Sequence, residues 1–130
     1  MRVLVVEDFD GWRDCIVEKL RENPRLRVVD FASDGLEAVR KAAEVRPDLI
    51  LLDINLPSLR GIEAARQIRE LVPESKIIFL TTETSATVAQ EALSLGAEGY
   101  VLKIYADSDL LNAVEAVLSG KRFVSKHLSD

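Results

Sequence analysis

Cysteine and histidine are nearly absent from this sequence, with one of each in 130 residues. Cys15 has no partner for an intrachain disulfide, which favours a reducing compartment, and we expect a cytoplasmic chain. His127 has no second His or Cys at a metal-binding spacing, so we expect it at the surface. A metal site in this chain would therefore be built from oxygen ligands.

Long hydrophobic runs are also missing. The longest stretch without a charged residue is Thr84–Gln90, whereas a transmembrane helix needs roughly 18 or more apolar residues. An early apolar run, Val3–Val6, ends at Glu7 and Asp8 before it could form the core of a signal peptide. We therefore expect neither a membrane span nor a membrane partner.

Positive charge is in deficit, because 17 Lys and Arg residues stand against 22 Asp and Glu residues, which gives a net charge of −5. Affinity for nucleic acid comes mostly from Lys and Arg that neutralise phosphates, so direct DNA binding by this chain is not expected. The basic group Lys121, Arg122 and Lys126 is too small to change that expectation. No internal repeat or low-complexity linker divides the chain, which predicts one domain over residues 1–130.

The sequence does contain a regular alternation of two kinds of segment. Short apolar runs predict five strands: Val3–Val6, Leu26–Phe31, Leu49–Leu52, Lys76–Leu80 and Gly99–Leu102. Apolar residues at helical spacing lie between and after them: Trp12, Ile16 and Leu20; Leu36, Val39 and Ala43; Ile62, Ala65, Ile68 and Val72; Val88, Ala92 and Leu95; Leu110, Val114 and Val117. This alternation predicts an α/β fold with a doubly wound parallel sheet and helices on both faces.

Side chains that can do chemistry follow the predicted strands. In an open parallel sheet, ligands bind beyond the carboxyl ends of the strands. The second strand ends in Ala32 and Ser33, which offer little chemistry, so we place it at an edge and predict the flavodoxin-like strand order 2-1-3-4-5. The other strand ends then share one cleft and supply these residues: Glu7 and Asp8, Asp53, Thr81, and Lys103.

Three carboxylates in one cleft point to a bound cation, because like charges about 4 Å apart repel by about 4 kcal/mol even at an effective dielectric of about 20. Carboxylate and carbonyl oxygens select Mg²⁺ or Mn²⁺. A metal, a lysine and a threonine around one carboxylate form the set needed for phosphoryl transfer to that carboxylate. We expect Asp53 to be the nucleophile, with Lys103 and the metal neutralising the phosphoryl oxygens and Thr81 donating to one of them.

Four motifs, in order and at matching spacing, resemble the receiver domain of two-component response regulators over the whole chain: Val3-Leu4-Val5-Val6-Glu7-Asp8, Leu51-Leu52-Asp53-Ile54-Asn55-Leu56-Pro57 with Gly61, Phe79-Leu80-Thr81, and Gly99-Tyr100-Val101-Leu102-Lys103. The resemblance implies that Asp53 is the phosphoacceptor. It also implies that Asp8, Asp53 and the backbone carbonyl of Asn55 bind Mg²⁺, with Glu7 acting largely through water.

The same resemblance implies a conformational switch. Thr81 and Tyr100 resemble the family's switch pair, in which the hydroxyl moves to the phosphoryl group and the ring swings inward. Asn55, Thr82 and Glu83 resemble the residues that flank the path of the hydrolytic water. The partner implied is a histidine kinase or a phosphotransfer protein, and phosphorylation is expected to change contacts either in a homodimer or with another protein.

One departure from the family pattern concerns the residue after Lys103. Many receivers have a cis-proline there, whereas this chain has Ile104, so we expect a trans peptide bond and a rearranged loop. Together with the ending from Val117 to Val124, this resembles the NarL/FixJ type, whose members usually carry a C-terminal helix-turn-helix. No such helix pair follows here, which leaves two expectations: the receiver half of a transcription factor, or a stand-alone receiver.

Three other interpretations of the same residues are possible. An aspartate-nucleophile phosphatase uses a similar set, but it needs a second Asp where this chain has Asn55. A flavin-binding module of the same fold would have its phosphate repelled by Glu7 and Asp8, and a receiver that is never phosphorylated would not need the complete set. Taken alone, Tyr100 is expected to be half-buried with its hydroxyl in water, and Cys15 to be packed beside the apolar stripe of the first helix.

Overall fold

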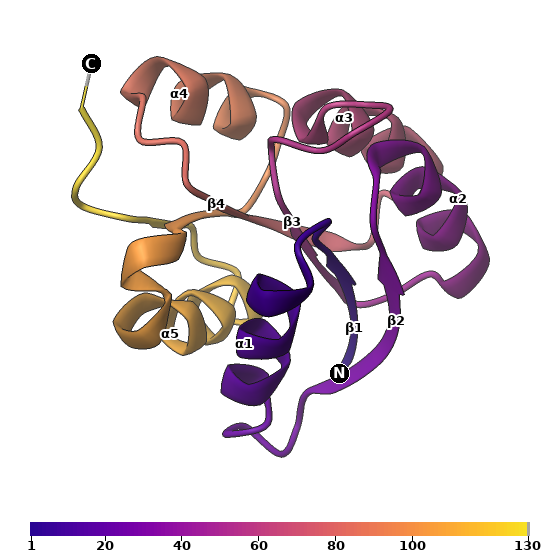
Figure 1. Ribbon diagram of the computed structural model, residues 1–130, viewed down its shortest axis with the longest axis horizontal. Helices are drawn as coiled ribbons and strands as arrows, with labels where there is room; N and C mark the ends of the chain where they lie inside the picture. Colours follow the sequence, from indigo (N-terminus) through magenta and orange to yellow (C-terminus); the bar gives the residue numbers. More distant parts are fainter. Residues whose placement is uncertain (130) are drawn as a thin grey trace.

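A parallel sheet forms the centre of the computed structural model, which describes residues 1–129 (Figure 1). Its order is β2-β1-β3-β4-β5-β6, and every neighbouring pair runs parallel. The strands are β1 (Arg2–Val6), β2 (Arg27–Ala32), β3 (Leu49–Leu52), β4 (Lys76–Thr81), β5 (Gly99–Leu102) and β6 (Phe123–Val124). The helices are α1 (Asp10–Leu20), α2 (Gly35–Val45), α3 (Gly61–Leu71), α4 (Ala86–Ser94) and α5 (Ala106–Leu118), with a 3-10 turn η1 (Lys103–Tyr105) before α5.

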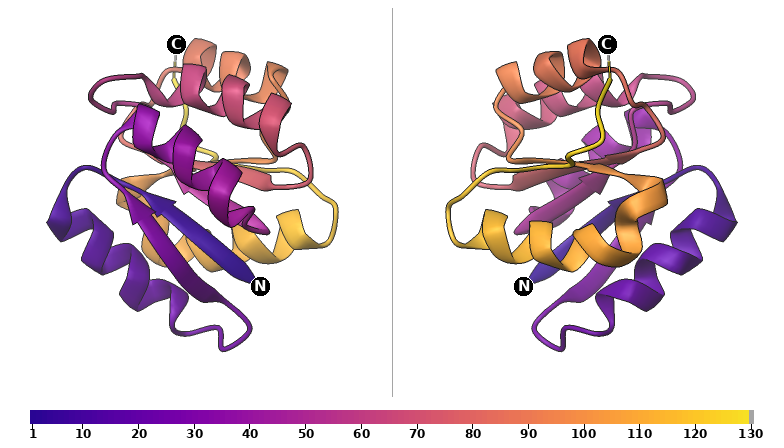
Figure 2. Two further views of the ribbon diagram at one scale, coloured as in Figure 1. Left: turned by 90° about the vertical axis from the view of Figure 1, so that its right-hand side faces the viewer. Right: turned by 90° about the vertical axis from the view of Figure 1, so that its left-hand side faces the viewer.

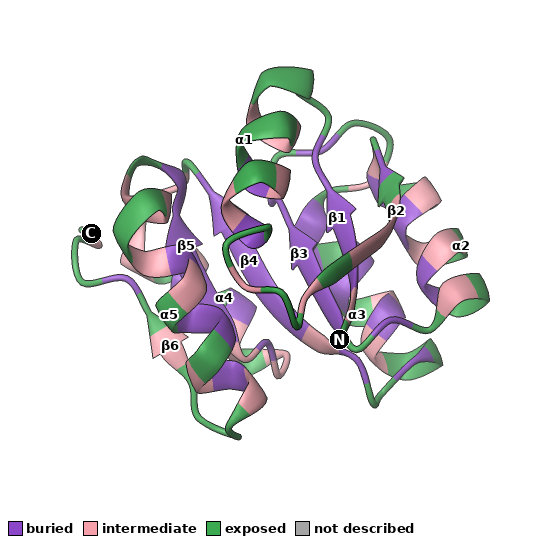
Figure 3. Cartoon of the chain, turned by 90° about the horizontal axis from the view of Figure 1, so that it is seen from below, coloured by how far each residue is buried: buried purple, intermediate pink, exposed green. Residues whose placement is uncertain are grey.

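The helices cover both faces of the sheet, as the alternation of strands and helices predicts (Figures 1 and 2). Helices α2, α3 and α4 pack on one face, where Ala38, Ile68 and Ala92 belong to one apolar core. Helices α1 and α5 pack on the other face, where Ile16 and Val114 belong to a second core. The inner strands are buried on both sides, and exposure is confined largely to the outer helix faces and the loops (Figure 3). No helix within residues 1–129 is long and apolar enough to cross a membrane.

The predicted strand order 2-1-3-4-5 is confirmed, and the structure adds one strand that the sequence analysis does not contain. Phe123 and Val124 form β6, which pairs with Gly99 and Tyr100 on the outer edge of β5. The chain returns to that edge after Gly120, whose φ of +83° suits a glycine at the C-terminal cap of α5. A strand of two residues has too little periodicity to be predicted, because its pairing depends on an edge that only the folded sheet provides.

The predicted apolar face of α2, which is Leu36, Val39 and Ala43, is correct only at Val39, which packs against the core. Leu36 and Ala43 are exposed, and the buried positions of this helix are Gly35, Ala38 and Ala42. Small residues are buried because α2 approaches its neighbours closely. A Cβ on Gly35 would lie 1.9 Å from the backbone oxygen of Leu59, so the backbone there leaves no space for a side chain.

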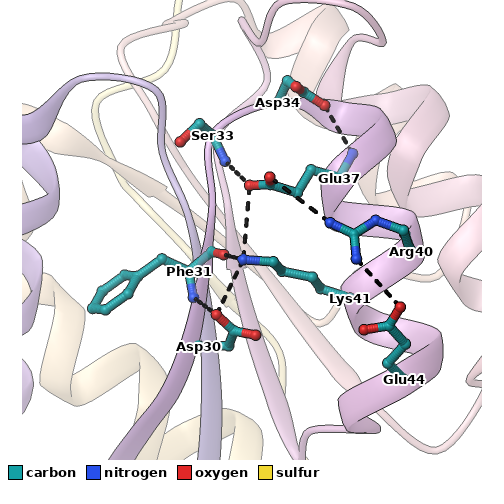
Figure 4. A network of polar contacts seen from close by, with 8 residues as sticks. All are labelled: Asp30, Phe31, Ser33, Asp34, Glu37, Arg40, Lys41 and Glu44. Atoms are coloured by element: carbon teal, nitrogen blue, oxygen red, sulfur yellow. Dashed lines mark hydrogen bonds and ion pairs between the residues drawn. The ribbon is translucent and has the colours of Figure 1, made fainter.

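A polar network joins the end of β2 to α2 on the outside of the molecule (Figure 4). Lys41 Nζ lies 3.1 Å from Oδ1 of Asp30 and also donates to the backbone oxygen of Phe31. Asp34 caps α2 by accepting from the backbone N–H of Glu37 at 2.8 Å, and Glu37 accepts in turn from the N–H of Ser33 at 2.8 Å. The network lies at the β2 edge of the sheet, far from β5, and contributes no residue to the predicted site.

Candidate functional site

The carboxyl ends of β1, β3, β4 and β5 place the predicted site residues side by side. Strand β3 pairs with both β1 and β4, and β4 pairs with β5. The residues that directly follow or end these strands therefore meet at one edge of the sheet. They are Glu7 and Asp8 after β1, Asp53 after β3, Thr81 at the end of β4 and Lys103 after β5.

Three carboxylates form an acidic cluster at this edge. One oxygen of each of Glu7, Asp8 and Asp53 lies within 4.8 Å of the others. Glu7 and Asp53 are buried, with 1% and 6% of their surface exposed, whereas Asp8 is exposed to solvent. The donor set consists of carboxylate oxygens and has one solvent-facing member, as expected of a site for a hard divalent cation. The cluster can hold a metal ion.

Lys103 supplies positive charge to the two buried acids of the cluster. Its Nζ lies 3.1 Å from Oδ2 of Asp53 and contacts Oε1 of Glu7, and the lysine is 5% exposed. The backbone N–H of Ile54 donates to the other Asp53 oxygen, Oδ1, at 2.7 Å. Asp53 is therefore held by hydrogen bonds to both of its carboxylate oxygens, which defines the direction in which the carboxylate faces the cleft.

The charge of the cluster is only partly balanced. Burial raises the pKa of Glu7, while Lys103 opposes the rise and the negative charge of Asp53 adds to it. Two buried carboxylates thus share one ammonium, with Asp8 nearby as a third acid. A cation at this position would relieve the repulsion, so the electrostatics agree with the ligand chemistry.

Thr81 and Tyr100 meet at the loop that joins β4 to α4, residues 82–85. The hydroxyl of Thr81 accepts from the backbone N–H of Glu83 at 3.1 Å, and the hydroxyl of Tyr100 donates to the backbone oxygen of Glu83 at 2.8 Å. The expectation of a half-buried Tyr100 with its hydroxyl in water is wrong, because the residue is fully buried. Burial, with the charges of Glu83 and Asp53, raises the pKa of its phenol well above the ordinary range.

Gly61, from the same predicted motif as Asp53, lies against the back of the site. A Cβ at this position would lie 1.9 Å from the backbone oxygen of Asp53, and the N–H of Gly61 donates to the oxygen of Ile54 at 2.7 Å. The start of α3 therefore packs directly on the loop that carries Asp53, the predicted nucleophile. Asn55 lies in that loop, exposed, and its backbone N–H lies 3.4 Å from Asp53 Oδ1.

A groove opens beside the site between α1 and the segment formed by η1 and α5. Its volume is about 380 Å³, and its lining includes Trp12, Cys15, Lys103 and Ile104. The Nζ of Lys103 lies 5.1 Å from the centre of the Trp12 ring, a cation–π contact that the sequence analysis missed. The only available signal was a tryptophan shortly after Asp8. Cys15 is exposed in this groove, so the expectation that it is packed is wrong.

The segment after Lys103 has the expected trans geometry. The described residues contain no cis peptide bond, and Lys103 to Tyr105 form the 3-10 turn η1. Ile104 points outward with 70% of its surface exposed. This trans 3-10 turn leaves Lys103 within reach of Asp53. His127 is exposed, as expected, and its ring stacks on Tyr105 with 4.4 Å between the centroids.

Comparison with known proteins agrees with this geometry. The model of the response regulator receiver domain family matches residues 3–115. The chain is 33% identical over 129 residues to the response regulator GacA of Pseudomonas viridiflava, covering 99% of this chain and 60% of that protein. It is 34% identical over 120 residues to the transcriptional regulatory protein LnrK of Bacillus subtilis, covering 92% of this chain and 54% of that one. A two-component response regulator of the LuxR family from Aurantimonas superposes with a TM-score of 0.91 at 34% identity, covering 96% and 89% of the two chains.

Proposed function

Because this chain belongs to the family of response regulator receiver domains, we propose that Asp53 accepts a phosphoryl group from a histidine kinase or a phosphotransfer protein. The observation that supports this most directly is the position of the Asp53 carboxylate. It lies 3.1 Å from the ammonium of Lys103, which also contacts Glu7, and within the acidic cluster that Asp53 forms with Glu7 and Asp8. We assign residues 1–130 to one receiver domain, of which the family model covers residues 3–115.

In the proposed reaction a phosphoryl group moves from the donor's imidazole to Asp53, and charged and polar groups of the site stabilise it. One oxygen of Asp53 forms a bond to phosphorus while the bond from phosphorus to the donor's imidazole nitrogen breaks, and its electron pair stays on that nitrogen. Lys103 neutralises charge on the phosphoryl oxygens, and the Thr81 hydroxyl donates to one of them after leaving Glu83.

Mg²⁺ fits the oxygen ligands of this site, and Mn²⁺ fits the same set. Asp8, Asp53 and the backbone carbonyl of Asn55 would hold it, with Glu7 acting through water. When bound, Mg²⁺ supplies positive charge that offsets both the acidic cluster and the phosphoryl oxygens. The pKa of Glu7 is raised first by its burial, and the negative charge of Asp53 adds to that rise.

Receiver domains are phosphoacceptors, and we propose that this chain catalyses its own phosphorylation and dephosphorylation rather than turning over free substrates. A phosphatase of the aspartate-nucleophile class needs an acid two residues after the nucleophile to protonate the leaving group. The residue there is Asn55, which cannot supply that proton. Asn55, Thr82 and Glu83 flank the route of the hydrolytic water in this proposal.

The groove beside the site suggests where a partner protein could dock. The groove between α1 and α5 borders Lys103, and Trp12 and Cys15 line it, so we propose that the phosphoryl donor docks there. The chain spans about 60% of the length of the GacA relative that it matches. We propose that it regulates transcription through a domain beyond this receiver, with a stand-alone receiver as the alternative. It acts in the cytoplasm, binds no DNA by itself, and forms a homodimer when phosphorylated.

The decisive experiment is incubation with acetyl phosphate and Mg²⁺, followed by intact-mass measurement. We expect a single phosphoryl adduct that is absent without Mg²⁺ and absent in Asp53→Asn. An adduct that persists in Asp53→Asn would overturn the assignment of the nucleophile. Multiple turnover of phosphomonoesters would favour the phosphatase instead. Sedimentation with and without beryllium fluoride tests the homodimer, and an unchanged monomer would leave a different protein as the partner.

A further inference from the structure

The last described residues cross from the edge of the sheet to the start of α4. Figures 1 and 2 show this segment, in yellow, leaving β6 beside β5 and running to α4. Its near end is firmly held. Ser125 is buried, its N–H donates to the oxygen of Tyr100 at 2.9 Å, and its hydroxyl accepts from the N–H of Leu102 at 3.0 Å. The same hydroxyl lies 3.3 Å from Oδ2 of Asp109, to which it can donate.

The far end of the segment is attached to the loop between β4 and α4. The N–H of Ser129 donates to the oxygen of Thr84 at 2.9 Å, and the N–H of Ala86 donates to the oxygen of Ser129 at 2.8 Å. Leu128 packs against the core beneath α4, and His127 stacks on Tyr105. Two backbone hydrogen bonds, one apolar side chain and one exposed ring stack thus hold this end, which is a small attachment compared with β6 and Ser125.

This loop is also the one that contacts both proposed switch residues. Glu83 lies between the hydroxyls of Thr81 and Tyr100, which bond to its N–H and its carbonyl oxygen respectively. Thr84, the next residue, accepts from Ser129. If the Thr81 hydroxyl turns toward a phosphoryl group on Asp53, the N–H of Glu83 loses its acceptor and the adjoining peptide of Thr84 must adjust.

We propose that residues 123–129 form an intramolecular strap that docks on the β4–α4 loop when Asp53 is unmodified and releases its far end, residues 126–129, when Asp53 is phosphorylated. This rests on the proposed function, because the trigger is the movement of Thr81. Ser125 and β6 remain in place and act as the hinge. By linkage, a strap that binds the unmodified state better weakens phosphorylation by the same factor as phosphorylation weakens the strap.

The chain offers a well-matched variant for testing the strap. Ala86 is the first residue of α4, a position where proline is tolerated, and Ala86→Pro removes the N–H that donates to Ser129. The preceding residue, Ser85, already has φ −66° and ψ 124°, which is the conformation that a residue before proline adopts. Ala86→Ser keeps the N–H and is the control.

The test is amide hydrogen exchange followed by NMR on the full chain, with Mg²⁺ and with or without BeF₃⁻. We expect BeF₃⁻ to accelerate exchange of Ser129 and Ala86 by at least roughly fivefold, the factor that one lost hydrogen bond gives. Exchange of Leu102, which donates to Ser125, should not change. Ala86→Pro should release Ser129 without BeF₃⁻ and tighten BeF₃⁻ binding by a similar factor, whereas Ala86→Ser should do neither.

Binding of BeF₃⁻ at Asp53 is followed separately by fluorine NMR, with Asp53→Asn as the negative control. Bound BeF₃⁻ with unchanged or slower exchange at Ser129 overturns the strap and leaves the proposed function standing. Absence of any Asp53-dependent BeF₃⁻ signal overturns both. If Ala86→Pro fails to fold, the comparison of the wild-type chain with and without BeF₃⁻ still decides the question.

Discussion

The Nζ of Lys103 lies 3.1 Å from Oδ2 of Asp53, although the two residues are 50 positions apart in the chain. Both are almost completely buried, and Glu7 contacts the same ammonium. The lysine therefore compensates two acids before any phosphoryl group or metal arrives. Replacing Lys103 should therefore have two separate effects, one on the rate of phosphoryl transfer and one on the affinity of the acidic cluster for a metal cation.

Lys103→Met should slow phosphorylation by acetyl phosphate by at least about 100-fold, because it removes the positive charge nearest the phosphoryl oxygens. The same change should tighten Mg²⁺ binding, since the acidic cluster then has no ammonium beside it. Intact-mass kinetics and calorimetry measure the two effects. Lys19→Met is the control, because Lys19 pairs with Asp107 and Glu22 at the groove and not with the cluster. Weaker Mg²⁺ binding in Lys103→Met would contradict the proposed arrangement of charges.

Asp8→Ala should lower Mg²⁺ affinity by more than about tenfold and abolish phosphorylation, while the thermal stability changes little. Asp8 is the exposed member of the cluster, so its removal leaves no cavity in the core. Asp10→Ala is the matched control, because Asp10 is exposed nearby but pairs with Arg13. Calorimetric titration with Mg²⁺ decides the outcome, and equal affinity in Asp8→Ala and the wild type would remove Asp8 from the metal site.

Gly61→Ala should lower the free energy of unfolding by about 2 kcal/mol or more, because its Cβ would lie 1.9 Å from the backbone oxygen of Asp53. Gly11→Ala is the contrasting change in another helix. Its Cβ meets only the side chain of Phe9, at 2.8 Å, and that exposed ring can move. This substitution should be neutral or stabilise α1 by up to about 1 kcal/mol. Urea unfolding of both variants provides the comparison, and equal effects would mean that the packing at Gly61 is not close.

Tyr100 should make the protein less stable at alkaline pH. The folded phenol has a raised pKa, so above the ordinary value of 10.0 the unfolded chain releases a proton that the folded chain retains. The free energy of unfolding should then fall by up to about 1.4 kcal/mol per pH unit from this group. Tyr100→Phe should lose this part of the pH dependence, and at pH 7 it should cost about 1 kcal/mol for the hydrogen bond to Glu83. Tyr105→Phe should retain the alkaline loss, and identical pH profiles for Tyr100→Phe and the wild type would contradict the prediction.

Much of the fold and the candidate site follows from local patterns in the sequence. The run Leu49–Leu52 predicts a strand buried on both faces, and its bounds in the structure are the same. The polar ends of the strands predict the order of the sheet, because carboxyl ends of parallel strands meet at one edge. Asp53 and Lys103 are therefore predictable as neighbours despite their separation in the chain.

Other features depend on packing between distant segments, which no local pattern encodes. The buried face of α2 uses Ala38 and Ala42 rather than Leu36, because the space beside α3 accepts only small side chains. The burial of Tyr100, its bond to Glu83 and the bonds of Ser129 to Thr84 and Ala86 arise only when β5, the β4–α4 loop and the C-terminal segment come together. The sequence by itself determined which residues could do chemistry at the strand ends, since that depends on residue type and period. The tertiary structure decided which loop contacts Thr81 and Tyr100, because a backbone hydrogen bond can form with any residue that the fold brings within reach.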